Sequence, residues 1–196
     1  GSSSINGMIY IRGHANDYDH WGQLGNIGWS YDDVLPYFKK SESFQGETSS
    51  KYHGFDGPLS VKRAKRTDDL LLDKFIEGGS QAGHPSTNDF NGKQQEGVSR
   101  YEHTMKGSKR CSASKAYLRP ALKRKNLITK LNITVNKVIF DGKKAIGIEY
   151  LKKGEKISSF ANKEIILSSG SLSSPMILMR SGIGDPKELT KFGIKT

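Results

Sequence analysis

Residues 164–184 read Glu-Ile-Ile-Leu-Ser-Ser-Gly-Ser-Leu-Ser-Ser-Pro-Met-Ile-Leu-Met-Arg-Ser-Gly-Ile-Gly, and this stretch decides the fold class. Residues 164–167, apolar from Ile165 on, predict a short buried strand, and the Ser/Gly residues after them predict a tight turn. Residues 174–180 predict a helix with Pro175 in its first turn, where proline costs little. A strand, a Gly/Ser turn and a helix in this order point the helix N-terminus at a phosphate group. We therefore predict an α/β class with mixed α+β character.

From Asn126 to this stretch, apolar and polar residues alternate with a period of two, which is typical of strands. The turn pairs Asp141-Gly142 and Lys153-Gly154 separate its later runs and favour hairpins. We predict an antiparallel meander of four strands, at residues 127–130, 133–140, 145–151 and 155–160.

The N-terminal half shows helix signals at several places. Residues 16–24 predict a helix that ends at Gly25, and Ser30 is the expected N-cap of a second helix. A third helix is expected to begin at Thr67, with Asp68 and Asp69 in its first turn, and to end at Gly78-Gly79 and Gly83. Residues 59–61 predict a short strand. Ser112 or Ser114 is expected to cap a further short helix that Pro120 disturbs.

The charge of the chain is uneven. The net charge is +11, with 11 Lys and Arg against 13 Asp and Glu in residues 1–100, and 20 against 7 in residues 101–196. A solvated basic face explains this better than a nucleic-acid site, because the basic residues are dispersed and no nucleic-acid signature accompanies them. No apolar run approaches the ~20 residues of a membrane span. The single cysteine, Cys111, excludes an internal disulfide and is expected to be an ordinary buried residue.

A search for catalytic patterns finds none that is complete. The five histidines are scattered without metal-ligand spacing, so we expect them to be surface or hydrogen-bonding residues and predict no metal site. A nucleophile elbow, a P-loop and a full dinucleotide fingerprint are all missing from the sequence. From the residues alone, the chain has one strand-turn-helix near its end that could bind an anion, and one Gly/Ser turn at its start. We assign no catalytic residue.

Three stretches taken together carry a resemblance to a known family. Residues 1–13 read Gly-Ser-Ser-Ser-Ile-Asn-Gly-Met-Ile-Tyr-Ile-Arg-Gly, and residues 110–118 read Arg-Cys-Ser-Ala-Ser-Lys-Ala-Tyr-Leu. The third stretch is Ser169-Gly170-Ser171, followed by Ser174-Pro175 and by Ser181-Gly182-Ile183-Gly184. In this order they resemble the glucose–methanol–choline (GMC) family of flavin oxidoreductases, and within it the insect glucose-dehydrogenase-like branch.

The resemblance implies a larger flavoprotein of which this chain is an internal fragment. Residues 1–50 and 111–196 would belong to a doubly wound FAD-binding domain that carries the meander. Residues 51–110 would belong to a substrate domain with an antiparallel sheet and helices. The dinucleotide fingerprint is then expected upstream, and the active-site histidine with its partner downstream.

The resemblance also implies which residues bind the cofactor FAD. Small residues let the backbone approach the cofactor, and an asparagine can offer both a donor and an acceptor. The strand residue Val135 would meet the adenine through its backbone. Ile5 stands where some relatives have a histidine linked covalently to flavin, so that link is not expected here. The predicted cofactor-binding residues are Ser2, Asn6, Gly7, Ile9, Val135 and Gly170.

The implied reaction is oxidation of an alcohol or sugar, in which a base takes the hydroxyl proton and hydride passes to flavin N5. A quinone-like partner or oxygen would reoxidise the flavin, and a dehydrogenase is favoured over an oxidase. Two alternatives stay open: a non-enzymatic basic binding module, and a family member without activity. By resemblance the compartment is extracellular, and Asn132-Ile133-Thr134 is a possible glycosylation acceptor, expected to lie in a strand.

Overall fold

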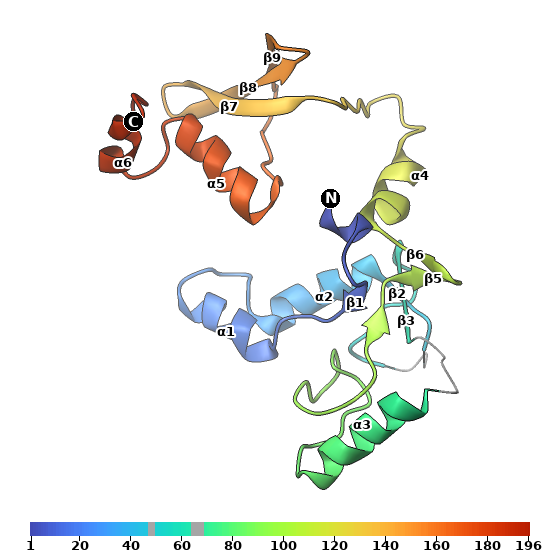
Figure 1. Ribbon diagram of the computed structural model, residues 1–196. Helices are drawn as coiled ribbons and strands as arrows, with labels where there is room; N and C mark the ends of the chain where they lie inside the picture. The colour runs from blue at the N-terminus through green and yellow to red at the C-terminus, as the bar shows by residue number, and fades with distance from the viewer. Residues whose placement is uncertain (47–49, 64–68) are drawn as a thin grey trace. The chain divides into compact units, whose positions relative to one another are not determined.

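The computed structural model describes all of the chain except residues 47–49 and 64–68 (Figure 1). The chain divides into two compact units, Gly1–Leu127 and Ile128–Thr196. Each unit is described by itself below.

The first unit combines short helices with a mixed sheet in the order β1-β4-β3-β2. β2 and β3 pair in parallel, β4 is antiparallel to both β1 and β3, and β5 with β6 forms a separate hairpin. The strands are β1 (Ile9–Tyr10), β2 (Glu42–Phe44), β3 (Leu59–Arg63), β4 (Glu102–His103), β5 (Met105–Lys106) and β6 (Lys109–Arg110). The helical elements are η1 (Ser2–Ser4), α1 (Ala15–Gln23), α2 (Tyr31–Ser41), α3 (Leu70–Gln81), the π-helical turn η2 (Ser114–Leu118) and α4 (Arg119–Ala121).

Side-chain caps set the starts of α1 and α2. As predicted, Ser30 is the N-cap of α2, and the carboxylate of Asp33 accepts a hydrogen bond from the Ser30 backbone N–H at 3.1 Å. His14 and Asp17 form the same kind of capping box on α1. Gly25, expected to end α1, adopts φ 96°, which a side chain would strain. These boundaries follow from local chemistry, so the sequence predicts them well.

The third helix differs from its prediction at its end. Thr67 and Asp68 lie outside the described residues, and Asp69 is the N-cap of α3, accepting from the Leu72 N–H at 3.3 Å. The prediction that Gly78-Gly79 ends the helix is wrong, because both lie inside it and it runs to Gln81. Gly79 is small for a packing reason: an added Cβ would come within 2.9 Å of the Val98 side chain. Gly83, with φ 89°, follows the true end.

The helix predicted near Ser112 is present in a different form. The Ser112 hydroxyl accepts a hydrogen bond from the Lys115 N–H at 3.3 Å, which is a capping contact. The turn that follows is π-helical and leads directly into α4. Pro120 lies in α4, which follows the π-helical turn without a break and ends at Ala121, so the helix is short and irregular around this proline, as expected.

The second unit is an antiparallel meander with two helices, α5 (Gly170–Arg180) and α6 (Pro186–Lys191). Its strands are β7 (Thr134–Asp141), β8 (Lys144–Lys152) and β9 (Glu155–Phe160), paired in that order as predicted. α5 packs against β7 (Figure 1). The Ser181 hydroxyl after α5 accepts a hydrogen bond from the Val138 N–H at 2.8 Å. The core of this unit is small, consisting of Val138, Tyr150, Ile177 and Leu189.

Two predicted strands are wrong, for a common physical reason. Residues 127–130 and 164–167 form irregular segments, and neither is paired with a strand among the described residues. Ile166, expected in a buried strand, has 75% of its surface exposed. A strand exists only when a neighbour satisfies its backbone N–H and C=O groups, and the apolar pattern alone cannot supply that neighbour.

The helix after the second segment begins earlier than predicted. α5 starts at Gly170 rather than at Ser174, so Pro175 is an interior residue instead of a first-turn residue. Proline in this position leaves the Ser171 carbonyl without its helical hydrogen-bond partner, a cost that a first-turn proline would avoid. Among the described residues, no helix has both the length and the apolar character needed to cross a membrane.

Candidate functional site

The opening segment, residues 1–9, turns tightly before it enters the sheet. In the 3₁₀ turn η1, the Ile5 and Asn6 N–H groups both donate to the Ser2 carbonyl, at 2.9 and 2.8 Å. The side chain of Asn6 then accepts from the Met8 N–H at 3.2 Å, and Met8 adopts φ 64°. This contact is an Asx turn, in which an asparagine side chain accepts from the backbone N–H two residues on.

Arg110 at the end of β6 holds this turn from outside. Its Nη1 donates to the Asn6 Oδ1 at 2.7 Å and to the Ser3 carbonyl at 3.2 Å. The Ala113 N–H donates to the Ser3 hydroxyl oxygen at 3.1 Å. Arg110 lies in one of the motifs that carry the resemblance, but the sequence assigned it no role. Only the fold brings residues about one hundred positions apart into hydrogen-bonding distance.

The predicted residues of the opening segment are each exposed to solvent. Ser2, Asn6, Gly7 and Ile9 are all exposed, and nothing lies within 4 Å of the place where a Gly7 side chain would begin. The Thr104 N–H donates to the Met8 carbonyl at 2.8 Å, which fixes the entry into β1. Small residues, open space and an asparagine amide fit the approach of a nucleotide cofactor.

The other two predicted residues, Val135 and Gly170, belong to the second unit. Val135 lines a hollow of about 350 Å³, and Ser169, next to Gly170, lines the same hollow. The strand register shifts between Val135 and Lys137, and Gly170 has φ 93° with open space around it. Within this unit the structure therefore brings the neighbourhoods of the two residues together. Their roles, and those of the four residues in the first unit, stay predictions.

A buried charged network lies just after β1, beyond the opening segment. Arg12 donates through Nη2 to the Glu42 carboxylate at 2.7 Å and through Nη1 to the Tyr52 carbonyl, also at 2.7 Å. His53 bridges Glu42, at 3.0 Å from Nδ1, and Asp89, at 2.9 Å from Nε2. With Arg12 and His53 both charged, the network balances two positive against two negative groups.

His53 is charged in spite of its burial. Only 1% of its side chain is exposed, and its ring stacks on Phe44 with 3.9 Å between ring centres. Burial alone disfavours the cation, but hydrogen bonds to Asp89 and Glu42 and their negative charges outweigh it and raise the pKa of His53 to about 9. Burial likewise pushes the pKa of Asp89 upward, but the hydrogen bonds from His53 and from the Asn91 N–H lower it below its usual value.

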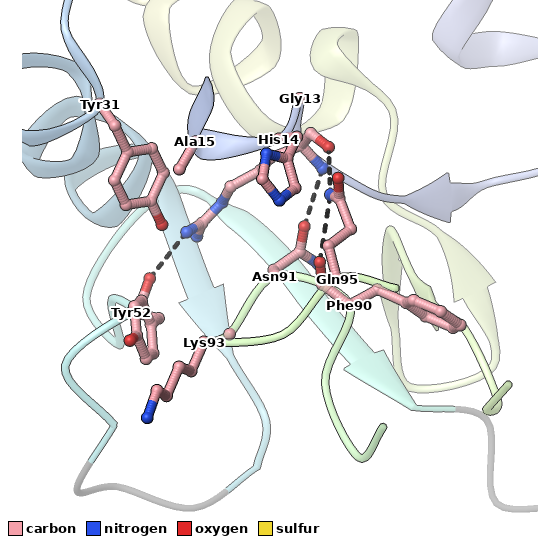
Figure 2. A pocket seen from close by; sticks show the side chains of 11 residues that line it. Gly13, His14, Ala15, Tyr31, Tyr52, Phe90, Asn91, Lys93 and Gln95 are labelled. Carbon is pink, nitrogen blue, oxygen red and sulfur yellow. Dashed lines mark hydrogen bonds between the residues drawn. The ribbon is translucent and has the colours of Figure 1, made fainter. Parts of the chain in front are cut away.

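Figure 2 shows a small pocket of about 160 Å³ beside this network. The side-chain oxygen of Asn91 accepts a hydrogen bond from the Arg12 backbone N–H at 2.8 Å. The side-chain amide of Gln95 donates to the Arg12 backbone carbonyl, also at 2.8 Å. The backbone on both sides of Arg12 is therefore fixed by side chains. The sequence predicted only that His53 would be a hydrogen-bonding residue, which is confirmed; the pairing of these charges was not predicted.

Residues 1–192 match the family described as GMC oxidoreductase. The chain belongs to the GMC oxidoreductase family. The resemblance stated from the three motifs is thereby confirmed at the level of the family. Cys111 is a free, buried residue, as expected. Within the described part of the GMC chain, no group of three or more His, Cys, Asp or Glu side chains is placed to hold a metal ion.

Similar curated proteins include choline dehydrogenases. Human mitochondrial choline dehydrogenase is 47% identical over 194 residues, which cover 99% of this chain and 32% of the relative. The oxygen-dependent choline dehydrogenase of Brucella ovis is 47% identical over 195 residues, covering 99% and 35%. The chain thus spans about a third of the length of these relatives.

Similar solved structures include an FAD-dependent oxidoreductase from Chaetomium thermophilum, with a TM-score of 0.94 and 31% identity. Pyridoxine 4-oxidase from Mesorbium loti gives 0.92 and 30%, and formate oxidase from Aspergillus oryzae RIB40 gives 0.85 and 26%. Each match covers the whole chain and 35 to 38% of the other protein. The predicted fold class and the predicted cofactor, FAD, are confirmed by these likenesses together with the family match.

Proposed function

We propose that this chain is part of a longer FAD-dependent oxidoreductase that oxidises CH–OH donors. The observation that carries the proposal is the opening segment, whose exposed residues include Gly7 and an asparagine side chain held by Arg110, in a chain matched by the GMC family over residues 1–192. When bound, FAD supplies the acceptor for the hydride that leaves the substrate carbon.

This chain contributes cofactor binding rather than proton transfer. Ser2, Asn6, Gly7 and Ile9 form the surface against which the cofactor rests, and the Arg12 network holds the chain where it leaves β1. The base that takes the hydroxyl proton is proposed to lie in a part of the protein beyond this chain, because no histidine here matches the position that the resemblance implies. His53 in particular is enclosed by two carboxylates and acts as a buried cation.

For the substrate, we propose a small primary alcohol such as choline or pyridoxine. Similar proteins are named for these two compounds. The insect glucose-dehydrogenase-like branch stays the alternative, with a sugar as substrate. The proposed electron acceptor is a quinone-like partner, with oxygen second.

We propose an extracellular location, which is supported only by the resemblance and by the possible glycosylation sequence that begins at Asn132. The expectation that Asn132 lies in a strand is wrong, because β7 begins at Thr134 and Asn132 is exposed in a bend with φ 56°. Removal of N-linked glycan from the secreted protein, read as a mobility shift that Asn132→Gln abolishes, would support this compartment.

The function is tested on the full protein purified from an overexpressing host. We expect a yellow protein with flavin absorbance and about one FAD per chain. It should reduce a quinone-like dye on addition of choline, pyridoxine or glucose, and the preferred alcohol decides between the two branches. A colourless protein that binds polyanions with a steep salt dependence would instead favour the binding-module alternative.

A further inference from the structure

The contacts of Asn6 fix the orientation of its side-chain amide. A guanidinium group carries only donors, so the Asn6 atom 2.7 Å from the Arg110 Nη1 must be the amide oxygen. The Met8 N–H, also a donor, contacts the same oxygen at 3.2 Å. Both lone pairs of the oxygen are therefore engaged within the chain.

The amide nitrogen of Asn6 is left to serve a ligand. Asn6 is exposed, and its Nδ2 makes no hydrogen bond to any residue that the structure describes. The sequence allowed Asn6 to act as donor or acceptor, and the structure leaves only the donor role. The ligand atom it would meet is therefore an acceptor, such as a carbonyl oxygen, a ring nitrogen or a phosphate oxygen.

Arg110 is itself held rigidly enough to orient a neighbour. It pairs with Met105 in the β5–β6 hairpin, and its carbonyl accepts from the Lys115 Nζ at 2.9 Å. The next residue, Cys111, is buried and donates its N–H to the Thr104 carbonyl at 2.8 Å. The same Thr104 donates to the Met8 carbonyl, so Arg110 and the opening segment share one framework.

We propose that Arg110 is a positioning residue that fixes the Asn6 amide so that its NH₂ group donates to an acceptor atom of FAD. This inference rests on the proposed function and deepens it. A residue at position 6 that keeps the contact to Arg110 but cannot donate outward should lose the cofactor without losing the fold.

Asn6→Asp makes that change with no change in size. One carboxylate oxygen would keep the Arg110 contact, now as an ion pair, while the other would replace the outward NH₂ with a negative acceptor. In the full protein we expect the FAD content after gel filtration to fall and the Kd of the apoprotein for FAD to rise at least about tenfold, because a donor is replaced by a repelling acceptor. The thermal midpoint of the apoprotein should not fall.

Arg110→Met tests the positioning role. We expect a Kd for FAD raised about three- to tenfold, since Asn6 keeps its chemistry but loses its fixed orientation, and partial recovery in Arg110→Lys, which restores a donor. Lys109→Met is the matched control, because Lys109 neighbours Arg110 in β6 and is exposed. It should leave the Kd unchanged.

A parallel titration with ADP identifies the acceptor. If Asn6→Asp weakens ADP as much as FAD, the acceptor is a pyrophosphate oxygen; if it weakens FAD alone, the acceptor lies on the flavin. Wild-type affinity for FAD in Asn6→Asp would overturn the inference, even if Arg110→Met does not fold. A full-length wild-type protein that binds no FAD would instead contradict the proposed function.

Discussion

Two arginines hold the start of the chain in opposite surroundings: Arg110 contacts the opening segment, and Arg12 lies just after β1. Arg12 is almost fully buried and pairs with a carboxylate that has no exposed surface. Arg110 contacts a neutral asparagine at the surface. Breaking a buried ion pair leaves an uncompensated charge, whereas breaking an exposed polar contact lets water replace it. The Arg12 end should therefore determine stability, and the Arg110 end the affinity for the ligand.

The largest effect is expected from Arg12→Met in the full protein. Glu42 would keep its contact with His53 but lose its ion pair with Arg12. The Tyr52 carbonyl would lose its hydrogen-bond donor. We expect the free energy of unfolding to fall by about 3–5 kcal/mol in urea denaturation. Arg119→Met, at an exposed arginine of the same unit, should change it by less than about 0.5 kcal/mol. A loss below about 1 kcal/mol for Arg12→Met would contradict the contrast drawn here.

The next largest effect is a pH dependence of the stability, which arises from the buried network around Arg12 and His53. Because the folded pKa of His53 is about 9 and the ordinary value is 6.5, its contribution is fully present below pH 6.5 and is lost as the pH rises through 9. That interval corresponds to up to about 3 kcal/mol. We expect the thermal midpoint of the wild type to fall between pH 6.5 and 9.

His53→Gln supplies the control for this pH dependence. The variant should be less stable at pH 6 and should show a flatter profile over the same interval. An equally steep fall in the variant would assign the dependence to other groups. The lowered pKa of Asp89 acts on the opposite side, since its contribution is present at neutral pH and is lost in acid.

The smallest effect is expected at the exposed end. Ser3→Ala removes the hydroxyl that accepts from the Ala113 N–H. We expect a loss of about 0.5–1 kcal/mol in the apoprotein, since water can reach the freed N–H. Ser4→Ala, one residue along the same turn, should cost less. If Ser3→Ala proved as damaging as Arg12→Met, the two ends would not differ in the way proposed.

The comparison also shows where sequence reasoning succeeds and fails. The Ser30 cap and the Gly25 terminus depend on neighbours within four residues, so the sequence predicted them. The β7-β8-β9 meander joins adjacent strands through short turns and was predicted for the same reason. The strands expected at residues 127–130 and 164–167 needed partners from elsewhere, and those predictions failed.

The sequence by itself determined the family and the cofactor, because short motifs in a fixed order identify them without any knowledge of distance; the cofactor-binding roles of the opening segment stay predictions. Only the tertiary structure decided that Asn6 faces outward as a donor and that His53 is a buried cation. Both facts depend on residues from distant parts of the chain, Arg110 in one case and Asp89 in the other. Hydrogen bonds and Coulomb energies depend on separations in space, which a linear pattern does not contain.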